Sequence, residues 1–150
     1  MTVNFRRAVK TDVPAIVAML ADDPLGATRE NTADMSAYFD AFDDIDANPG
    51  ELLIVADRDG EVVGTLQLTF LRGLSRGGAT RAQIEAVRVR SDARSGGLGK
   101  RLIAWAVDES RRRGCHLVQL TSDRSRVDAH RFYEKLGFAG THLGYKLTLV

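Results

Sequence analysis

Apolar and polar residues follow two different periods along the chain, and the change from one period to the other predicts its secondary structure. Runs rich in β-branched and aromatic residues, typical of strands, cover Val3–Val9, Leu52–Asp57, Glu61–Leu71, Gln83–Arg90, His116–Thr121 and Thr141–Val150. Apolar residues spaced three and four apart, typical of helices, cover Pro14–Leu20, Thr32–Ala47, Leu98–Arg113 and Ala129–Leu136. Asp59-Gly60, between the second and third of these strands, favours a tight hairpin.

This order of elements predicts one mixed α/β domain over residues 1–150. A strand is followed by two helices and three strands, and the chain then alternates helix, strand, helix, strand. Hairpins give antiparallel pairs and helical connections give crossovers, so we expect a sheet that is partly antiparallel and partly crossover-connected. The length of 150 residues and the hydrophobic content of 44% suit a single core.

Composition argues against several classes of protein. No apolar stretch approaches the roughly 20 residues that span a bilayer, and the first residues have no apolar run typical of a secretory leader. We therefore expect a cytoplasmic protein without membrane contact. The single cysteine, Cys115, and three histidines are too few for an internal disulfide or a cysteine-based metal site, so no metal is expected.

The net charge of +1 conceals an uneven distribution of charged residues. Residues 21–50 contain eight acidic residues and one basic residue, whereas residues 72–113 contain eleven basic residues and four acidic ones. The sequence thus predicts one surface suited to cations and another suited to anions.

The segment Val87–Leu102 carries the clearest chemical signal. A strand ends there, a glycine-rich turn follows, and a helix begins. Backbone N–H groups at a helix start are unpaired and lie at the positive end of its dipole, which favours an anion. The glycines leave the backbone open to a phosphate, and basic residues add formal charge; they are Gly96, Gly97, Gly99, Arg94, Lys100 and Arg101. A diphosphate ligand fits this design.

Two common phosphate loops do not match this segment. The dinucleotide pattern G-x-G-x-x-G requires glycine where the chain has Leu102. The P-loop pattern requires glycine in place of Arg94 and serine or threonine in place of Arg101.

Two other motifs do match a known family. Arg94-Ser95-Gly96-Gly97-Leu98-Gly99 fits the acetyl-CoA signature written R or Q-x-x-G-x-G or A, and Ala129–Phe138 fits the segment A-x-x-F-Y-x-x-x-G-F. The chain therefore resembles the GNAT superfamily of acyl-CoA-dependent N-acetyltransferases over its whole length. This resemblance implies a single GNAT-like domain with a central mixed, twisted sheet, helices on both faces, and acetyl-CoA as acyl donor.

The resemblance also implies roles for individual residues. Backbone groups of Val87 and Val89 are expected to pair with the pantetheine arm. The pyrophosphate is expected to lie against Arg94 and the amides of Ser95, Gly96, Gly97, Leu98, Gly99 and Lys100. Tyr133 is the candidate general acid, since a phenol with a pKa near 10 can protonate a departing thiolate; its alternative role is an aromatic anchor of the helix.

Glu85 is the candidate general base that deprotonates the acceptor amine. Strict alternation places it on the same strand face as Val87 and Val89, with Ile84, Ala86 and Arg88 on the other face. Its alternative role is an exposed strand residue or the partner of an arginine. His130 is the second candidate base, because imidazole titrates in the useful range.

One position departs from the family pattern. Many relatives have asparagine seven residues before the helix tyrosine, and this chain has Arg126. Arg124 and Arg126 then either reach an anionic group or remain solvated.

The expected reaction is transfer of an acetyl group from acetyl-CoA to a primary amine of a small metabolite, by direct attack in a ternary complex. The acidic segment 21–50 favours a cationic acceptor. A protein lysine or N-terminal acetyltransferase and a non-catalytic acyl-CoA-binding module are the alternatives. Nucleic-acid binding is not expected, because no such motif is present. The apolar residues of the last predicted strand either face the core or support a homodimer; they are Leu143, Tyr145, Leu147 and Leu149.

Overall fold

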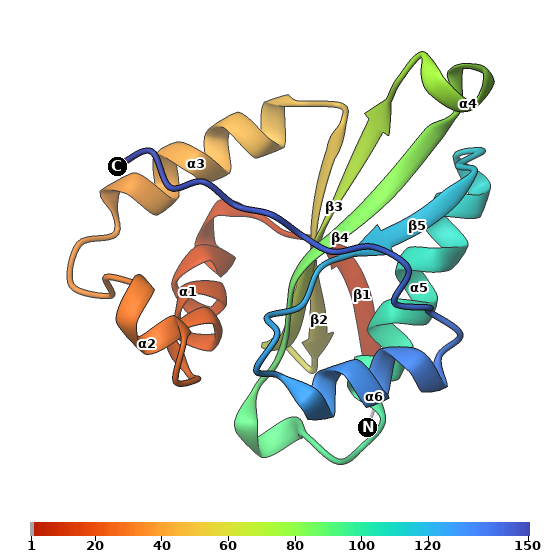
Figure 1. Cartoon of the computed structure of the whole chain (residues 1–150). Helices are drawn as coiled ribbons and strands as arrows, with labels where there is room; N and C mark the ends of the chain where they lie inside the picture. Colours follow the sequence, from red (N-terminus) through yellow and green to blue (C-terminus); the bar gives the residue numbers. More distant parts are fainter. Residues whose placement is uncertain (1) are drawn as a thin grey trace.

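Five strands form one mixed sheet in a computed structural model that describes residues 2–150 (Figure 1). The strands lie in the order of the sequence and are β1 (Val3–Arg7), β2 (Glu51–Arg58), β3 (Glu61–Arg72), β4 (Thr80–Val89) and β5 (Leu117–Leu120). Pairs β1–β2, β2–β3 and β3–β4 are antiparallel, and β4–β5 is parallel. Asp59 and Gly60 both have positive φ, 53° and 89°, as expected for a two-residue hairpin that follows the twist of its strands. The predicted mixed sheet is confirmed.

Helices cover both faces of this sheet. The helices of the described residues are α1 (Val13–Ala21), α2 (Gly26–Arg29), α3 (Ser36–Ala47), α4 (Ser75–Gly78), α5 (Leu98–Arg112) and α6 (Val127–Lys135), with short 3-10 turns at Lys10–Asp12 and Ser91–Ala93. Of these, α4 lies at the tip of the β3–β4 connection rather than on a face of the sheet (Figure 1). The helix predicted over Thr32–Ala47 begins later, at Ser36, because the Asp34 carboxylate accepts bonds from the amide and hydroxyl of Ser36 and so forms a turn just before the helix. Within residues 2–150, no helix is long and apolar enough to cross a membrane.

Two clusters of buried side chains hold the layers together. The larger cluster joins one face of the sheet to α5 and contains the fully buried Ile54, Leu66 and Leu102. The smaller cluster joins the other face to α1 and α3 through Val55 and Phe42. Because alternate strand residues point to opposite faces, neighbours such as Ile54 and Val55 belong to different clusters.

Strand β4 departs from regular alternation at Ala86. Its register with β3 shifts there, since Glu85 pairs with Gln67 while Arg88 pairs with Thr65. Three steps along β4 therefore match two along β3, which defines a β-bulge. Ala86 has φ 54°, in the left-handed region that a residue with a Cβ rarely adopts.

The prediction that Thr141–Val150 forms a strand of this sheet is wrong. These residues are extended in Figure 1 but pair with no strand, and all of them are exposed. Alternation indicates that a segment can form a strand, but it does not indicate which edge the segment pairs with.

The left-handed conformation at Ala86 predicts an unusual response to glycine. We expect Ala86→Gly to raise the free energy of unfolding by about 0.5–1 kcal/mol, because relief of a left-handed strain of about 1–2 kcal/mol exceeds the entropy cost of glycine. We expect Ala86→Val to lower it. The measurement is urea unfolding followed by circular dichroism.

The matched control is Ala104→Gly on the exposed face of α5. This variant should lower the free energy of unfolding by about 1 kcal/mol. Equal losses in both alanine-to-glycine variants would show that Ala86 is not left-handed in solution.

Candidate active site

The sheet opens between its two parallel strands. Strand β4 pairs with β5 only as far as Ile84 opposite Leu120, where β5 ends, and β4 continues to Val89. The edge of β4 that faces β5 therefore has no strand partner beyond Ile84 in the described residues. Backbone groups of Val87 and Val89 lie along this stretch, as a hydrogen-bonded ligand arm requires.

The bulge at Ala86 changes which side chains share a face of β4. Val87 and Val89 pack into the larger cluster together with Ile84, whereas Arg88 reaches Asp23, in the loop after α1, on the opposite side. Glu85 lies on the same side as Arg88, because their partners Gln67 and Thr65 share a face of β3. The predicted face of Glu85, Val87 and Val89 is thus wrong, since the extra residue inverts the alternation.

The turn before α5 leaves its backbone open. Gly97 has φ 75° and precedes the first helical residue, and no side chain caps the helix. A Cβ added to Gly96 or Gly97 would meet no atom within 4 Å, so neither glycine is required by packing inside the protein. The unpaired amides and this open space fit a phosphate group. Ser95 is also left-handed, with φ 75°.

The other predicted residues of this turn differ in what they can offer. Leu98 is buried in the core, so only its backbone is available. Arg94 donates from Nε to the carbonyl of Val89 at 3.1 Å and keeps an exposed guanidinium. Lys100 is exposed, and the helix start at Gly99 lies against Phe132 of α6.

Tyr133 lies in an aromatic group on α6. Its ring contacts Phe132 and Phe138 edge to face, with centroids 5.2 and 5.9 Å away. Burial raises the pKa of the Tyr133 phenol above its usual value, and the nearby charges of Arg126 and Arg88 oppose the rise only in part. The phenol therefore stays protonated at neutral pH, as a general acid must, and the aromatic contacts position it.

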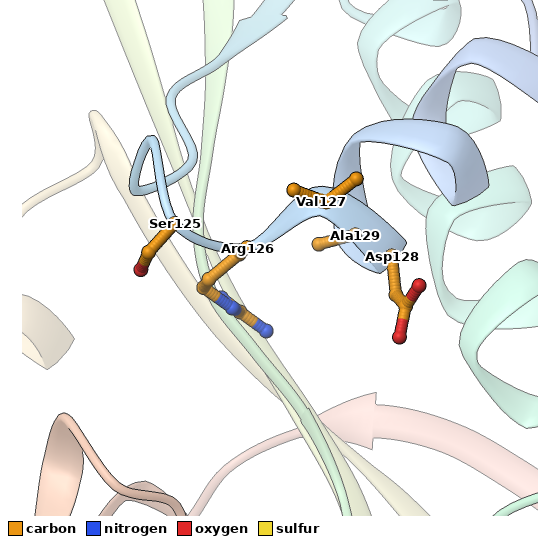
Figure 2. Close-up of a pocket in the computed structure, with 5 residues that line it drawn as sticks. All are labelled: Ser125, Arg126, Val127, Asp128 and Ala129. Carbon is orange, nitrogen blue, oxygen red and sulfur yellow. The ribbon is translucent and has the colours of Figure 1, made fainter.

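Two arginines from distant parts of the chain converge on the surroundings of this tyrosine. Arg88 Nε lies 3.2 Å from a carboxylate oxygen of Asp23, and both side chains are largely buried. A hydrogen bond from the Gly26 amide and the charges of Arg88 and Arg126 hold the pKa of Asp23 below its usual range. Arg126 lies at the start of α6 and lines a pocket of about 340 Å³ (Figure 2). Arg88 forms an ion pair with Asp23, the charge of Arg126 also acts on that carboxylate, and Asp128 lines the same pocket as Arg126.

Sequence reasoning singled out Arg126 as a residue that could reach an anionic group, but it missed Asp23 and Arg88. Asp23 counted only as part of an acidic segment, and Arg88 only as a strand residue. Sixty-five positions separate them in the sequence, and no local motif links them.

The candidate bases differ in their surroundings. Glu85 is exposed and accepts a hydrogen bond from the Gln83 amide at 2.8 Å, and Gln83 in turn accepts one from Gln119. The His130 ring bonds through Nε2 to the carbonyl of Asp123 at 2.9 Å, which requires Nε2 to carry a proton. That contact gives His130 a structural role in the loop before α6.

Half of the acidic residues in segment 21–50 form ion pairs with basic residues. Lys10–Asp43 is 3.0 Å, Arg7–Asp46 is 3.4 Å and Arg94–Asp22 is 3.9 Å, in addition to the pair of Arg88 and Asp23. These contacts reduce the negative field that this segment can present to an acceptor.

Neither metal binding nor a cysteine nucleophile gains support from the geometry. Among residues 2–150, no three histidine, cysteine, aspartate or glutamate side chains lie together as metal ligands would. Burial raises the pKa of the Cys115 thiol, which keeps it in its less reactive protonated form.

The open strand pair, the uncapped glycine turn and the half-buried tyrosine are the parts expected of an N-acetyltransferase that uses an acyl-CoA donor. A profile of the Acetyltransferase (GNAT) family matches residues 16–138, so the chain belongs to this family of acetyl-CoA-dependent N-acetyltransferases. Known proteins are similar over most of the chain. Aminoalkylphosphonate N-acetyltransferase of Salmonella typhimurium is 29% identical over 146 residues, 97% of this chain and 91% of that protein.

Two further comparisons concern part of the sequence and the whole fold. Glucosamine 6-phosphate N-acetyltransferase of Trypanosoma brucei brucei is 38% identical over 90 residues, 60% of this chain and 59% of that protein. The crystal structure of a transcriptional regulator from Bacillus halodurans C-125 superposes with a TM-score of 0.95 at 45% identity, covering 99% of this chain and 100% of that one.

The open turn predicts how acetyl-CoA stabilises the protein. A ligand at 100 times its dissociation constant adds about 2.7 kcal/mol to the free energy of unfolding. We expect Gly96→Ala to leave the free energy of unfolding of the ligand-free protein unchanged, because the new methyl group meets no atom within 4 Å. We expect the same variant to bind acetyl-CoA more weakly, and each tenfold loss of affinity removes about 1.4 kcal/mol of the stabilisation by the ligand. Thermal unfolding with and without acetyl-CoA measures both quantities.

Gly73→Ala is the matched control, since its added Cβ would meet only one arginine nitrogen, at 3.9 Å. Acetyl-CoA should stabilise Gly73→Ala as much as the unaltered protein. If it also stabilised Gly96→Ala as much, the pyrophosphate would not bind at this turn.

Proposed function

We propose that this protein acetylates the primary amine of a small metabolite that also carries an anionic group. The observation that supports the anionic group is that the charges of both Arg88 and Arg126 reach Tyr133, while among the described residues only Arg88 of the two forms an ion pair, with Asp23. An acceptor with phosphonate, phosphate or carboxylate would supply the missing negative charge at hydrogen-bond distance from a guanidinium.

The catalytic steps follow from the assigned groups. The neutral amine attacks the thioester carbonyl carbon of acetyl-CoA, and the carbon–sulfur bond breaks. Before the attack, the ammonium form of the acceptor loses a proton to Glu85, directly or through water. After the attack, the departing sulfur takes a proton from the Tyr133 hydroxyl, and the second proton that the nitrogen gives up restores this hydroxyl, so the products are an acetylated amine and free CoA. Backbone groups of Val87 and Val89, and the amides of the turn from Ser95 to Lys100, would orient the donor.

Similar proteins support the same class of acceptor. The Salmonella typhimurium relative is named for aminoalkylphosphonates and the Trypanosoma brucei brucei relative for glucosamine 6-phosphate. Each of these acceptors joins an amine to a phosphorus-based anion. The acidic segment 21–50 supports the opposite charge, but four of its eight acids are engaged in ion pairs. Absence of a metal requirement and a cytoplasmic location remain predictions.

Loss of the two proton-transfer groups should change different parts of the pH profile. We expect Tyr133→Phe to lower kcat about 10²–10⁴-fold while acetyl-CoA still binds, because the sulfur then leaves without a proton donor. We expect Glu85→Gln to lower kcat most on the acidic side, where the amine must be deprotonated. Steady-state rates across pH measure both effects.

Tyr145→Phe is the control for Tyr133→Phe, since its side chain is exposed. An unchanged kcat in Tyr133→Phe would show that Tyr133 is not the general acid. If the unaltered protein bound acetyl-CoA but turned over no amine, the alternative of a non-catalytic acyl-CoA-binding module would be favoured.

Acceptor charge is tested by a panel of amines of equal length that end in phosphonate, carboxylate, hydroxyl or a second amine. We expect kcat/KM to be highest for the anionic members, and Arg126→Ala to lower it for them by about tenfold or more through loss of a charge-assisted hydrogen bond. The hydroxyl member should change little.

Arg131→Ala removes an equal charge from an exposed position on the same helix and is the control. Preference for the diamine would favour a cationic acceptor instead. Activity only on a peptide amine would favour the protein acetyltransferase.

A further inference from the structure

The segment that follows α1 is held mainly by polar contacts. We call residues 22–30, which include the four-residue helix α2, the α2 segment. Gly26 is its only buried residue, and in the part of the chain that the structure describes neither buried cluster includes any of its side chains. The place of the α2 segment in the fold therefore depends on individual hydrogen bonds and ion pairs rather than on burial of apolar side chains.

Asp23 both closes the α2 segment and attaches it to the sheet. Oδ1 of its carboxylate accepts a hydrogen bond from the Gly26 amide at 2.5 Å, and its carbonyl accepts one from the Ala27 amide at 2.9 Å. Gly26 lies against the end of α1, since an added Cβ would lie 1.8 Å from the carbonyl oxygen of Leu20. This turn leaves Oδ2 of Asp23 for Arg88, whose Nε lies 3.2 Å away.

Arg88 joins the α2 segment to the backbone of β4. While Nε lies beside Asp23, Nη1 donates a hydrogen bond to the carbonyl of Val87 at 2.9 Å, in the stretch of β4 that extends beyond β5. The side chain of Arg88 is 17% exposed, so water weakens these contacts little. One guanidinium thereby connects the α2 segment to the strand on which the acyl donor is expected.

The α2 segment faces the remaining functional residues across β4. Figure 1 shows α1 and α2 on one side of this strand and α5 and α6 on the other. The charge of Arg126, at the start of α6, reaches both Asp23 and Tyr133. The charge of Arg29, at the end of α2, reaches Asp123 in the loop before α6. An acceptor that approaches Tyr133 would therefore lie between the α2 segment and the start of α6.

We propose that Arg88 is a positioning residue, which holds the α2 segment beside the acceptor and does not itself bind the anionic group. The charge of Arg88 is already paired with Asp23, and an anion bound to Arg88 would lie next to that carboxylate and be repelled. Among the described residues Arg126 forms no ion pair, and it lines a pocket in which it can bind the anion. The choice between the two arginines rests on the proposed function, whereas the positioning of the α2 segment does not depend on the identity of the acceptor.

Loss of a positioning contact and loss of an anion ligand would change acceptor selectivity in different ways. The first experiment measures KM and kcat of Arg88→Gln and Arg126→Ala with the four amines of the panel. We expect Arg88→Gln to raise the KM of all four amines by about tenfold, because the α2 segment is displaced for every acceptor. We expect Arg126→Ala to act on the anionic members alone. A loss in Arg88→Gln that is confined to the phosphonate and the carboxylate would make Arg88 an anion ligand and overturn the proposal.

Arg6→Gln is the control for a loss of stability alone. Arg6 pairs with Asp12 at 2.8 Å and with Asp57 at 3.0 Å, and it lies on β1, at the opposite edge of the sheet from β5. We expect this variant to lower Tm without raising the KM of any amine. An unchanged KM in Arg88→Gln, or an equal rise of KM in Arg6→Gln, would contradict a positioning role.

The second experiment needs no acceptor. Hydrogen exchange measures the protection of the amides of Gly26, Ala27 and Glu30, which donate hydrogen bonds within the α2 segment. Asp23→Asn keeps an oxygen for the Gly26 amide but removes the charge that pairs with Arg88. We expect these amides to exchange about tenfold faster in Arg88→Gln and in Asp23→Asn, and no faster in the double variant, because the two side chains act through one contact.

The two experiments separate this role from the proposed function. Unchanged exchange in Arg88→Gln, or additive effects in the double variant, would show that Arg88 does not hold the α2 segment. An amine panel without a preference for anions would refute the proposed class of acceptor, while faster exchange together with a uniform rise of KM would still support the positioning role of Arg88.

Discussion

The departure of β4 from its two neighbours is the constraint on which the candidate site depends. On one side, the bulge at Ala86 shifts the register with β3, and on the other, β5 ends opposite Ile84. A regular strand would pair along both edges and leave no backbone for a ligand. The interruption leaves a short length of β4 free, next to the start of α5 and the aromatic residues of α6. A left-handed alanine is the structural cost of this opening.

The bulge also determines the electrostatics. It directs Arg88 toward Asp23 on the α1 side, while Val87 and Val89 remain in the core. The charged group near Tyr133 thus combines arginines from a strand and a helix start with a carboxylate from a loop, which the fold alone brings together. Local pairing likewise reduces the field of the acidic segment, so the sign of the potential at the site does not follow from a count of charges along the chain.

At the C-terminal end of the chain, an extended segment and the edge of β5 both lack a strand partner among the described residues. A tail with alternating apolar residues and an edge strand of core composition are both present in one molecule, and neither is satisfied within it.

The class of fold, the hairpin at Asp59-Gly60 and the two motifs around Gly97 and Tyr133 could be predicted without the structure, because they depend on periodicity and on residues close together in the chain. The sequence could not determine the face of Glu85, since nothing in Glu-Ala-Val signals that Ala86 adopts a left-handed conformation. It predicted that Thr141–Val150 can be a strand but not which edge it joins. The pairing of Arg88 with Asp23 was likewise decided only by tertiary structure, because a contact across sixty-five residues depends on how the sheet and the helices pack.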